Sequence, residues 1–177
     1  MQEIRLHGRG GQGLVKASHI VVRTAVETGH YGQFIPFFGV ERKGSPVFGF
    51  LRLSEEEIRR KTQVYEPDVL IILDDTLVHL PATYAGLKEG GTVVINSVRD
   101  AAALKMPAQA GKVAIVDATG ICMEELGRNI PNTAMLGAFA RVTGLVDKDR
   151  LFDNIAAEFG ENNRRAAMRA YDAVQVM

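Results

Sequence analysis

The sequence HGRGGQG, at residues 7–13, combines glycines with polar side chains that could bind a phosphate. Its glycines satisfy the pattern G-x-G-x-x-G, which is typical of dinucleotide-binding loops: Gly8, Gly10 and Gly13. Glycine lets the backbone approach a phosphate closely, and the N–H groups at the start of the following helix attract an anion. Arg9 and Gln12 add side-chain donors. We therefore expect contact with an anionic ligand, although the same glycines could serve only to pack a helix on a sheet.

The surrounding sequence argues against NAD as that ligand. A dinucleotide fold also needs an acidic residue about twenty residues farther on, at the end of the second strand, to bind the ribose hydroxyls. Glu27 has this spacing but belongs to a predicted helix. The next extended segment contains FIPFFG, at residues 34–39, which has no acidic residue. A different phosphate-bearing ligand therefore fits the loop better.

A second loop, FFGVERKGSPV at residues 37–47, is short and basic. Arg42 and Lys43 supply positive charge, and the following Gly44 and Ser45 offer N–H and hydroxyl donors. Such a turn suits a phosphate ester. Glu41 would neutralise part of this charge if the loop only forms ion pairs on the surface, and residue chemistry alone leaves both interpretations open.

Alternating strands and helices must position these loops. Apolar runs predict strands at 3–6, 47–53, 68–74, 90–96 and 112–118, with a long loop over 31–46. Helical spacing and capping residues predict helices at 14–28, 77–87, 99–104, 119–126, 132–143, 147–159 and 161–176. The pattern predicts one α/β domain over residues 1–177, with a Rossmann-like, mostly parallel open sheet flanked by helices.

The carboxyl ends of these strands are the expected ligand-binding edge. We therefore expect the loops at 7–13, 39–46, 74–76, 96–98 and 117–120 to share one rim. Polar residues on or near this rim have simpler roles as turn or helix caps: Asp74, Asp75 and Asn132. His7 is expected to be structural.

Composition narrows the classes of function. The 177 residues contain 21 basic and 21 acidic side chains, so no net charge attracts nucleic acid or an anionic membrane. No segment reads as a signal peptide or a membrane span, which predicts a cytoplasmic protein. Cys122 is the single cysteine, which excludes an internal disulfide and a four-thiolate cluster within this chain. The histidines show no metal-ligand spacing, and we predict neither a metal site nor a catalytic residue.

Several motifs occur together in a fixed order: GRGGQG, FGVERKGSPV, YEPDVLIILDDTL, GLKEGGTVVIN and IPNTAMLGAFARVTGLV. In this order they resemble the gamma subunit of 2-oxoacid:ferredoxin oxidoreductases. ERKGSPV and NTAMLGAF resemble the pyruvate and 2-oxoisovalerate branch more than the 2-oxoglutarate branch. The resemblance extends from residue 3 to about residue 173.

The resemblance implies a subunit that is inactive alone. The expected partners are the alpha, beta and delta subunits, or their fused equivalents, which would carry thiamine diphosphate, Mg and [4Fe-4S] clusters and pass electrons to ferredoxin. This chain would bind none of these cofactors itself, but would contact coenzyme A as a substrate at a shared site. The implied contacts are Gly8, Arg9, Gly10, Gln12 and Gly13 in the first loop, and Arg42, Lys43, Gly44 and Ser45 in the second.

Two other functions stay open at this point. A free-standing nucleotide-binding α/β protein would use the glycine loop, Gly8–Gly13, without partners. A gamma-like part of a related oxidoreductase would act on aryl or other 2-oxoacids. Recovery of partner subunits with the chain would distinguish the subunit from the free-standing protein.

Overall fold

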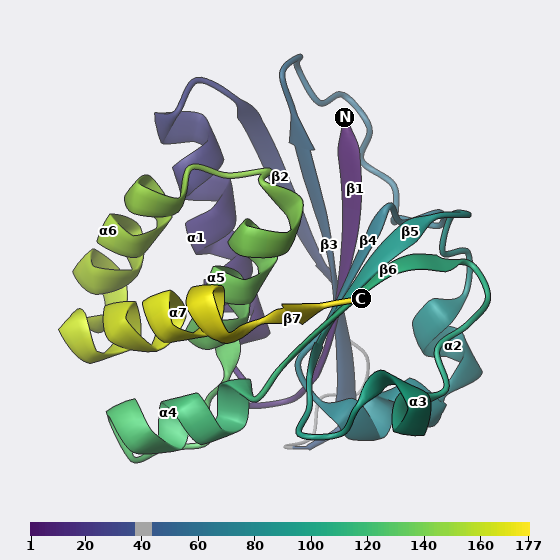
Figure 1. Cartoon of the computed structure of the whole chain (residues 1–177). Helices are drawn as coiled ribbons and strands as arrows, with labels where there is room; N and C mark the ends of the chain where they lie inside the picture. The colour runs from purple at the N-terminus through teal and green to yellow at the C-terminus, as the bar shows by residue number, and fades with distance from the viewer. Residues whose placement is uncertain (38–43) are drawn as a thin grey trace.

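The computed structural model describes residues 1–37 and 44–177, and these residues form a single open sheet with helices on both faces (Figure 1). The strands are β1 (Gln2–Arg9), β2 (Tyr31–Phe37), β3 (Pro46–Ser54), β4 (Val69–Ile72), β5 (Gly91–Asn96), β6 (Ala110–Val116) and β7 (Gln175–Val176). Their spatial order is β2-β3-β1-β4-β5-β6-β7. β1, β4, β5 and β6 are parallel, whereas β2, β3 and β7 run antiparallel to their neighbours. The predicted open α/β sheet with a parallel core is confirmed.

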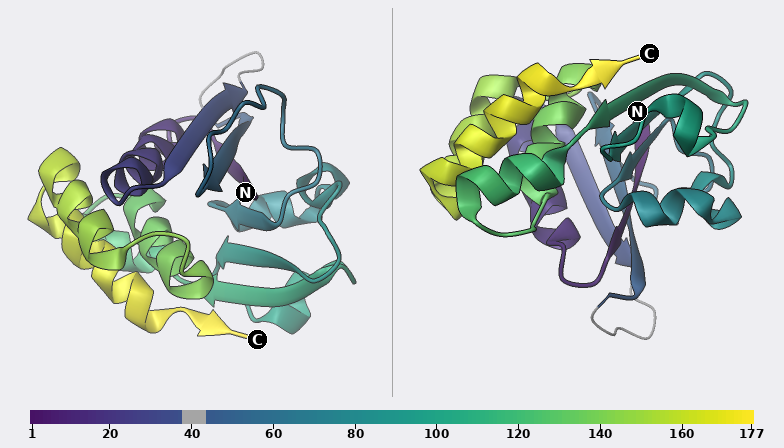
Figure 2. Two further views of the ribbon diagram at one scale, coloured as in Figure 1. Left: turned by 90° about the horizontal axis from the view of Figure 1, so that it is seen from above. Right: turned by 60° about the horizontal axis from the view of Figure 1, so that its bottom comes forward.

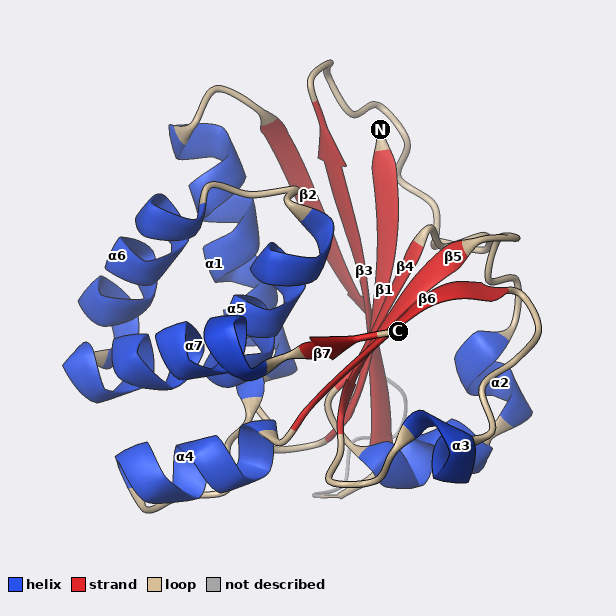
Figure 3. Cartoon of the chain, in the orientation of Figure 1, coloured by secondary structure: helices blue, strands red, loops and turns tan. Residues whose placement is uncertain are grey.

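The helices divide between the two faces of the sheet. They are α1 (Leu14–Glu27), a 3-10 helix η1 (Asp75–His79), α2 (Pro81–Tyr84), α3 (Ala101–Leu104), α4 (Ala118–Leu126), α5 (Asn132–Thr143), α6 (Lys148–Phe159) and α7 (Glu161–Ala173). Figure 3 shows α1 and α4–α7 together on one face, and α2 and α3 on the other. The two further views in Figure 2 show the same separation.

β4 lies at the centre of the sheet and is buried on both faces. Val69 and Ile71 pack into the apolar cluster beneath α1 and α5, whereas Leu70 and Ile72 pack into the cluster on the opposite face. A strand covered by helices on both sides needs apolar residues at consecutive positions. The prediction of a buried parallel strand from this apolar run is confirmed.

Two predictions between the strands are wrong. Residues 31–37 form β2 and not a loop; β2 is an edge strand, where Pro36 is tolerated because its missing N–H can face away from the ladder. The predicted helix at 77–87 is instead η1 followed by the four-residue α2. Leu80 is extended (φ −88°, ψ 117°) before Pro81, and a proline cannot continue the hydrogen bonding of a preceding helix.

The end of the chain also differs from its prediction. α7 ends at Ala173, and Gln175–Val176 forms β7 against β6 instead of a last helical turn. The helix predicted at 99–104 is shortened to α3, whose start is fixed by the Asp100 carboxylate accepting from the Ala103 N–H at 2.8 Å. The bounds predicted for α5 agree with the structure.

Gly137 allows α5 and α7 to pack closely. A Cβ atom at this position would overlap the backbone carbonyl of Ala167 on α7. Helix propensity alone would make Gly137→Ala stabilising by about 1 kcal/mol. Because the clash involves backbone, we expect the opposite: a loss of about 2–3 kcal/mol in the free energy of unfolding.

Urea unfolding of the purified chain measures this effect. Adding Ala167→Gly should not restore the stability of Gly137→Ala, since the overlap is with the carbonyl and not with the side chain of Ala167. A Gly137→Ala chain at least as stable as the parent would contradict the close packing.

Candidate functional site

The glycine loop is shorter than its sequence indicates. β1 continues through Gly8 to Arg9, so the prediction of a loop that begins at His7 is wrong. Pairing with β3 keeps these residues extended, and the loop itself comprises Gly10–Gly13. Gly13 ends it in the left-handed conformation (φ 75°, ψ 24°), which favours glycine, and forms the N-cap of α1 without a side-chain hydrogen bond.

The glycine loop and the second loop contact each other through their backbones. The Gly10 N–H donates to the Ser45 carbonyl at 2.9 Å, and the Gly44 N–H donates to the Gly10 carbonyl at 3.2 Å. β3 runs antiparallel to β1, with Pro46 opposite Arg9, which brings the Gly44–Ser45 turn to the carboxyl end of β1. Two residues predicted to bind phosphate lie outside the described residues: Arg42 and Lys43.

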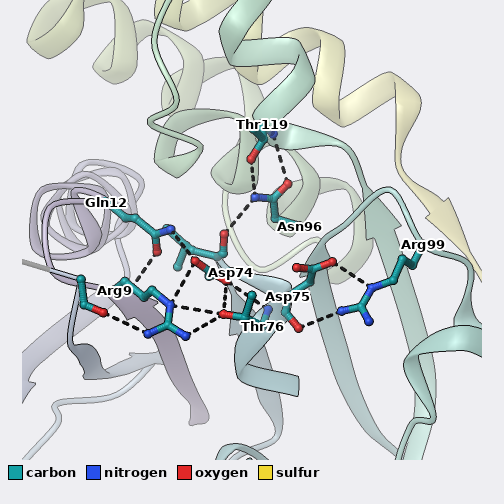
Figure 4. A network of polar contacts seen from close by, with 10 residues as sticks. Arg9, Gln12, Asp74, Asp75, Thr76, Asn96, Arg99 and Thr119 are labelled. Carbon is teal, nitrogen blue, oxygen red and sulfur yellow. Dashed lines mark hydrogen bonds and ion pairs between the residues drawn. The ribbon is translucent and has the colours of Figure 1, made fainter. Parts of the chain in front are cut away.

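Arg9 binds neighbouring protein groups with most of its guanidinium (Figure 4). Its Nη1 donates to the Gly44 carbonyl at 3.0 Å, its Nη2 donates to the Thr76 hydroxyl at 2.7 Å, and its Nε lies 3.3 Å from the Asp74 carboxylate. The charge of Arg9 is therefore balanced within the protein. Arg9 connects the β1 end to both the second loop and the end of β4.

Gln12 makes a second connection between the glycine loop and β4. Its Oε1 accepts from the Arg9 backbone N–H at 2.7 Å, and its Nε2 donates to Asp74 at 3.2 Å. Asp74 also caps η1 by accepting from the Thr76 N–H at 3.0 Å, which confirms the predicted cap. Burial acts to raise the pKa of Asp74, but hydrogen bonds from Thr76 and Gln12 and the charge of Arg9 more than offset it and lower the pKa.

Asn96 connects the carboxyl ends of β4, β5 and β6. Its Nδ2 donates to the Leu73 carbonyl and to the Thr119 hydroxyl, both at 2.9 Å, and its Oδ1 accepts from the Thr119 N–H at 3.1 Å. The sequence analysis did not identify Asn96 or Thr119 as residues that join the strand ends. The available signal was a polar residue directly after an apolar strand, in the segment TVVIN.

Asp75 completes the polar rim. It accepts from the Ser97 hydroxyl at 2.8 Å and from the Arg99 Nε at 3.1 Å. A cavity of about 290 Å³ lies among the strand ends, lined by Gln12, Asp74, Asp75, Asn96, Asp117 and Thr119, among others. In the described parts of the chain, the predicted meeting of these loops at one rim is confirmed.

Asn132 connects the glycine loop to α5. Pro131, and not Asn132, occupies the N-cap position, so the predicted cap is wrong in its position. The Asn132 Oδ1 accepts from the Thr133 N–H at 2.8 Å, and its Nδ2 donates to the Gly13 carbonyl at 3.3 Å. A Cβ atom at Gly13 would overlap the Asn132 amide, so glycine is needed for this contact as well as for the positive φ.

A larger cavity of about 650 Å³ lies on the other side of the glycine loop. Its lining includes cationic, acidic, amide and apolar side chains: Lys16, Arg128, Glu161, Asn132, Asn163, Leu126 and Phe159. The Lys16 ammonium lies 5.7 Å from the centre of the Phe159 ring. The glycine loop therefore separates a small polar rim from a larger and more cationic cavity.

The sheet order excludes the usual NAD arrangement around this loop. In a dinucleotide fold the strand after the first helix lies directly beside the first strand and carries the ribose-binding acid at its end. Here β2 follows α1 and runs in the same direction as β1, but β3 lies between the two strands. The absence of an acidic residue in this segment therefore agrees with the topology.

His7 has a structural environment, as expected. Its side chain is 1% exposed, its Nε2 accepts from the Arg5 Nε at 2.9 Å, and its ring packs edge-on against Phe48. Within residues 1–37 and 44–177, no three His, Cys, Asp or Glu side chains are grouped so that they could hold a metal ion. None of the helices in that part of the chain is long and apolar enough to cross a membrane.

Comparison with known proteins identifies a family that covers nearly the whole chain. The model of the family described as pyruvate ferredoxin/flavodoxin oxidoreductase matches residues 3–173. The chain is 48% identical to pyruvate synthase subunit PorC of Methanothermobacter marburgensis, over 99% of this chain and 98% of that protein. It is 47% identical to the pyruvate/ketoisovalerate oxidoreductases common subunit gamma of Thermococcus kodakarensis, with the same coverage.

Solved structures agree with this assignment. The crystal structure of pyruvate oxidoreductase subunit PORC from Thermotoga maritima superposes with a TM-score of 0.88 and 38% identity, covering 99% of this chain and 97% of that one. A 2-oxoglutarate:ferredoxin oxidoreductase from Magnetococcus marinus shares the fold alone, at 18% identity and a TM-score of 0.75, and this chain covers 30% of it. The motifs, the sheet and these similarities together show that the chain belongs to the pyruvate ferredoxin/flavodoxin oxidoreductase family, as a subunit of the gamma type.

Proposed function

We propose that this chain helps a pyruvate:ferredoxin oxidoreductase complex, or one for a related 2-oxoacid, to bind coenzyme A and to close the shared active site. The complex decarboxylates the 2-oxoacid oxidatively, forms the acyl-coenzyme A and passes electrons to ferredoxin. Alpha, beta and delta subunits, or their fused equivalents, would hold thiamine diphosphate, Mg and the [4Fe-4S] clusters. The names of the relatives, pyruvate synthase subunit PorC among them, support the reaction class.

The contact between the two loops carries the proposal for coenzyme A. Hydrogen bonds between Gly10 and the Gly44–Ser45 turn hold the two loops together at the carboxyl end of β1. This is also where the chain order reverses, because β1 connects onward to β2 and β3 on one side and β4 connects to β5 on the other. Ligands of open α/β sheets bind at such switch points.

The chemistry of the described side chains supports a binding role over a catalytic one. Cys122 is fully buried on α4, and burial raises the pKa of its thiol to about 11. A buried thiol of high pKa is a poor nucleophile. Arg9 and Gln12 are engaged within the protein, so we assign them to shaping the loop. Arg42 and Lys43 supply the charge for the coenzyme A phosphates.

Anaerobic affinity purification of the tagged chain from its own cells tests the complex. We expect a thiamine-diphosphate subunit and a cluster-bearing subunit in fixed ratio, identified by mass spectrometry. Recovery of the chain alone with a nucleotide bound would overturn the subunit role and support the free-standing alternative.

Removing the two cations tests the coenzyme A contact. In the assembled complex, Arg42→Ala/Lys43→Ala is expected to raise the KM for coenzyme A by roughly tenfold or more, because hydrogen bonds to charged groups contribute about 1.5–3 kcal/mol each. The KM for the 2-oxoacid should be unchanged. Steady-state kinetics at varied coenzyme A concentration gives both constants.

A matched pair of cations at the far end of the sheet provides the control. Arg59 is exposed and lines a cavity together with Met1 and Gln2, at the amino end of β1, and Lys61 is exposed nearby in sequence. Arg59→Ala/Lys61→Ala removes the same charge and should leave the KM for coenzyme A as it is. Equal effects of the two double variants would argue against a specific phosphate contact.

A further inference from the structure

We propose that Asp74 is a positioning residue that fixes the glycine loop and the Gly44–Ser45 turn relative to each other, and thereby determines the affinity of the assembled enzyme for coenzyme A. This inference rests on the proposed function. Asp74 lies beyond the end of β4, on a different element from either loop, and was expected only to cap a helix.

Asp74 divides its two oxygens between the loop and its own turn. Oδ2 accepts from the Gln12 Nε2 at 3.2 Å and lies 3.3 Å from the Arg9 Nε. Oδ1 accepts from the Thr76 hydroxyl at 2.6 Å and from the Thr76 N–H at 3.0 Å. The carboxylate is therefore held by η1 while it binds Arg9 at the end of β1 and Gln12 in the glycine loop.

Arg9 extends this connection to the second loop. The guanidinium that pairs with Asp74 also donates to the Gly44 carbonyl at 3.0 Å. The pair is only partly exposed, with side-chain exposures of 32% for Arg9 and 20% for Asp74. Charge-assisted hydrogen bonds in such a setting restrict geometry more strongly than neutral ones. A neutral Asp74 would remove the ion pair with Arg9 and so weaken the position of the side chain that also reaches Gly44.

Two physical effects of Asp74→Asn have opposite signs, which makes the variant informative. If Asp74 acted only through its charge, removing that charge and freeing Arg9 would favour an anionic ligand and lower the KM for coenzyme A. If Asp74 positions the loops, the KM rises because the ligand must order them on binding. We expect the KM for coenzyme A to rise roughly tenfold in the assembled complex, with kcat within about twofold of the parent, since one charge-assisted hydrogen bond is lost.

Asp68→Asn is the matched control. Asp68 precedes the opposite end of β4, has a similar side-chain exposure of 25%, and pairs with Lys88 at 2.7 Å. Asp68→Asn removes the same charge as Asp74→Asn and, like it, breaks one ion pair. We expect a similar decrease in thermal stability and an unchanged KM for coenzyme A, which separates positioning from general destabilisation.

Thr76→Val tests the inference with a smaller change. It keeps a β-branched side chain but removes the hydroxyl that donates to Asp74 and accepts from Arg9. We expect a severalfold rise in the KM for coenzyme A even if Asp74→Asn fails to assemble. An unchanged or lowered KM in an assembled Asp74→Asn or Thr76→Val complex would overturn the inference. If the Arg42→Ala/Lys43→Ala complex also keeps its KM, the proposed coenzyme A contact itself fails.

Discussion

Arg52→Met is expected to lower the free energy of unfolding by about 3–5 kcal/mol, because it breaks a buried ion pair and leaves Glu3 with only the more exposed Arg60, at 3.4 Å. The Arg52 side chain is fully buried in β3, and its Nε donates to Glu3 on β1 at 2.8 Å. Its remaining N–H groups donate to the carbonyls of Thr62 and Gln63, at 2.7 and 3.0 Å, and to Gln33 at 3.0 Å. The guanidinium therefore holds the segment after β3 against the sheet.

Denaturant unfolding of Arg52→Met and of Arg59→Met measures the contrast. Arg59 pairs with Glu57 on the surface, with side-chain exposures of 86% and 63%, so its loss should cost less than about 1 kcal/mol. Replacing Glu3 together with Arg52 by apolar residues should recover part of the loss. A cost for Arg52→Met as small as for Arg59→Met would contradict the role of the buried ion pair.

Acidification from pH 6.5 to pH 4 is expected to destabilise the chain by about 3 kcal/mol through His7 alone. Burial, and then the charge of Arg5, lower the pKa of His7 to about 3 in the folded chain. The unfolded histidine has a pKa of about 6.5 and binds a proton first. The contribution of the neutral ring to stability is therefore complete above pH 6.5 and decreases with falling pH until about pH 3.

His7→Gln isolates this effect, because glutamine does not titrate and its amide oxygen can still accept from Arg5. The difference in unfolding free energy between parent and variant should shrink by about 1.4 kcal/mol per pH unit below pH 6.5. Hydrogen bonds from Asn154 and Arg23 lower the pKa of Glu27 to about 2. Glu27 titrates in both proteins, so its contribution cancels in the difference between their unfolding free energies. Parallel pH profiles for the two proteins would contradict a neutral, buried His7.

Sequence predicts the elements whose signals are local. β4 was predicted because a strand covered on both faces must be continuously apolar. α5 was predicted from its helical spacing and from Gly144, which ends it with a left-handed φ of 63°. β2 was missed because an edge strand is partly exposed and its Gly32 and Pro36 are typical of loops.

The sequence predicted where the candidate site lies, but not which side chains pair with one another there. The order of strands and loops indicated which segments meet at the carboxyl edge. Whether a cation there is free or paired depends on residues far apart in sequence: Arg9 and Asp74 are brought together only by the parallel pairing of β1 with β4. The sequence therefore indicated that Arg9 donates hydrogen bonds to a phosphate, whereas its contacts indicate that it holds the loops together.

The length of the paired strands β2 and β3 determines where the Gly44–Ser45 turn lies. Its register is continuous from Tyr31 opposite Ser54 to Phe37 opposite Phe48, and β3 is also bound to β1 along its length. Inserting one residue in each strand would turn every later side chain to the opposite face of the sheet. Two residues in each strand preserve the faces and move the turn by about 7 Å. A change in the position of the Gly44–Ser45 turn that preserves both faces of the sheet therefore needs two residues in each strand.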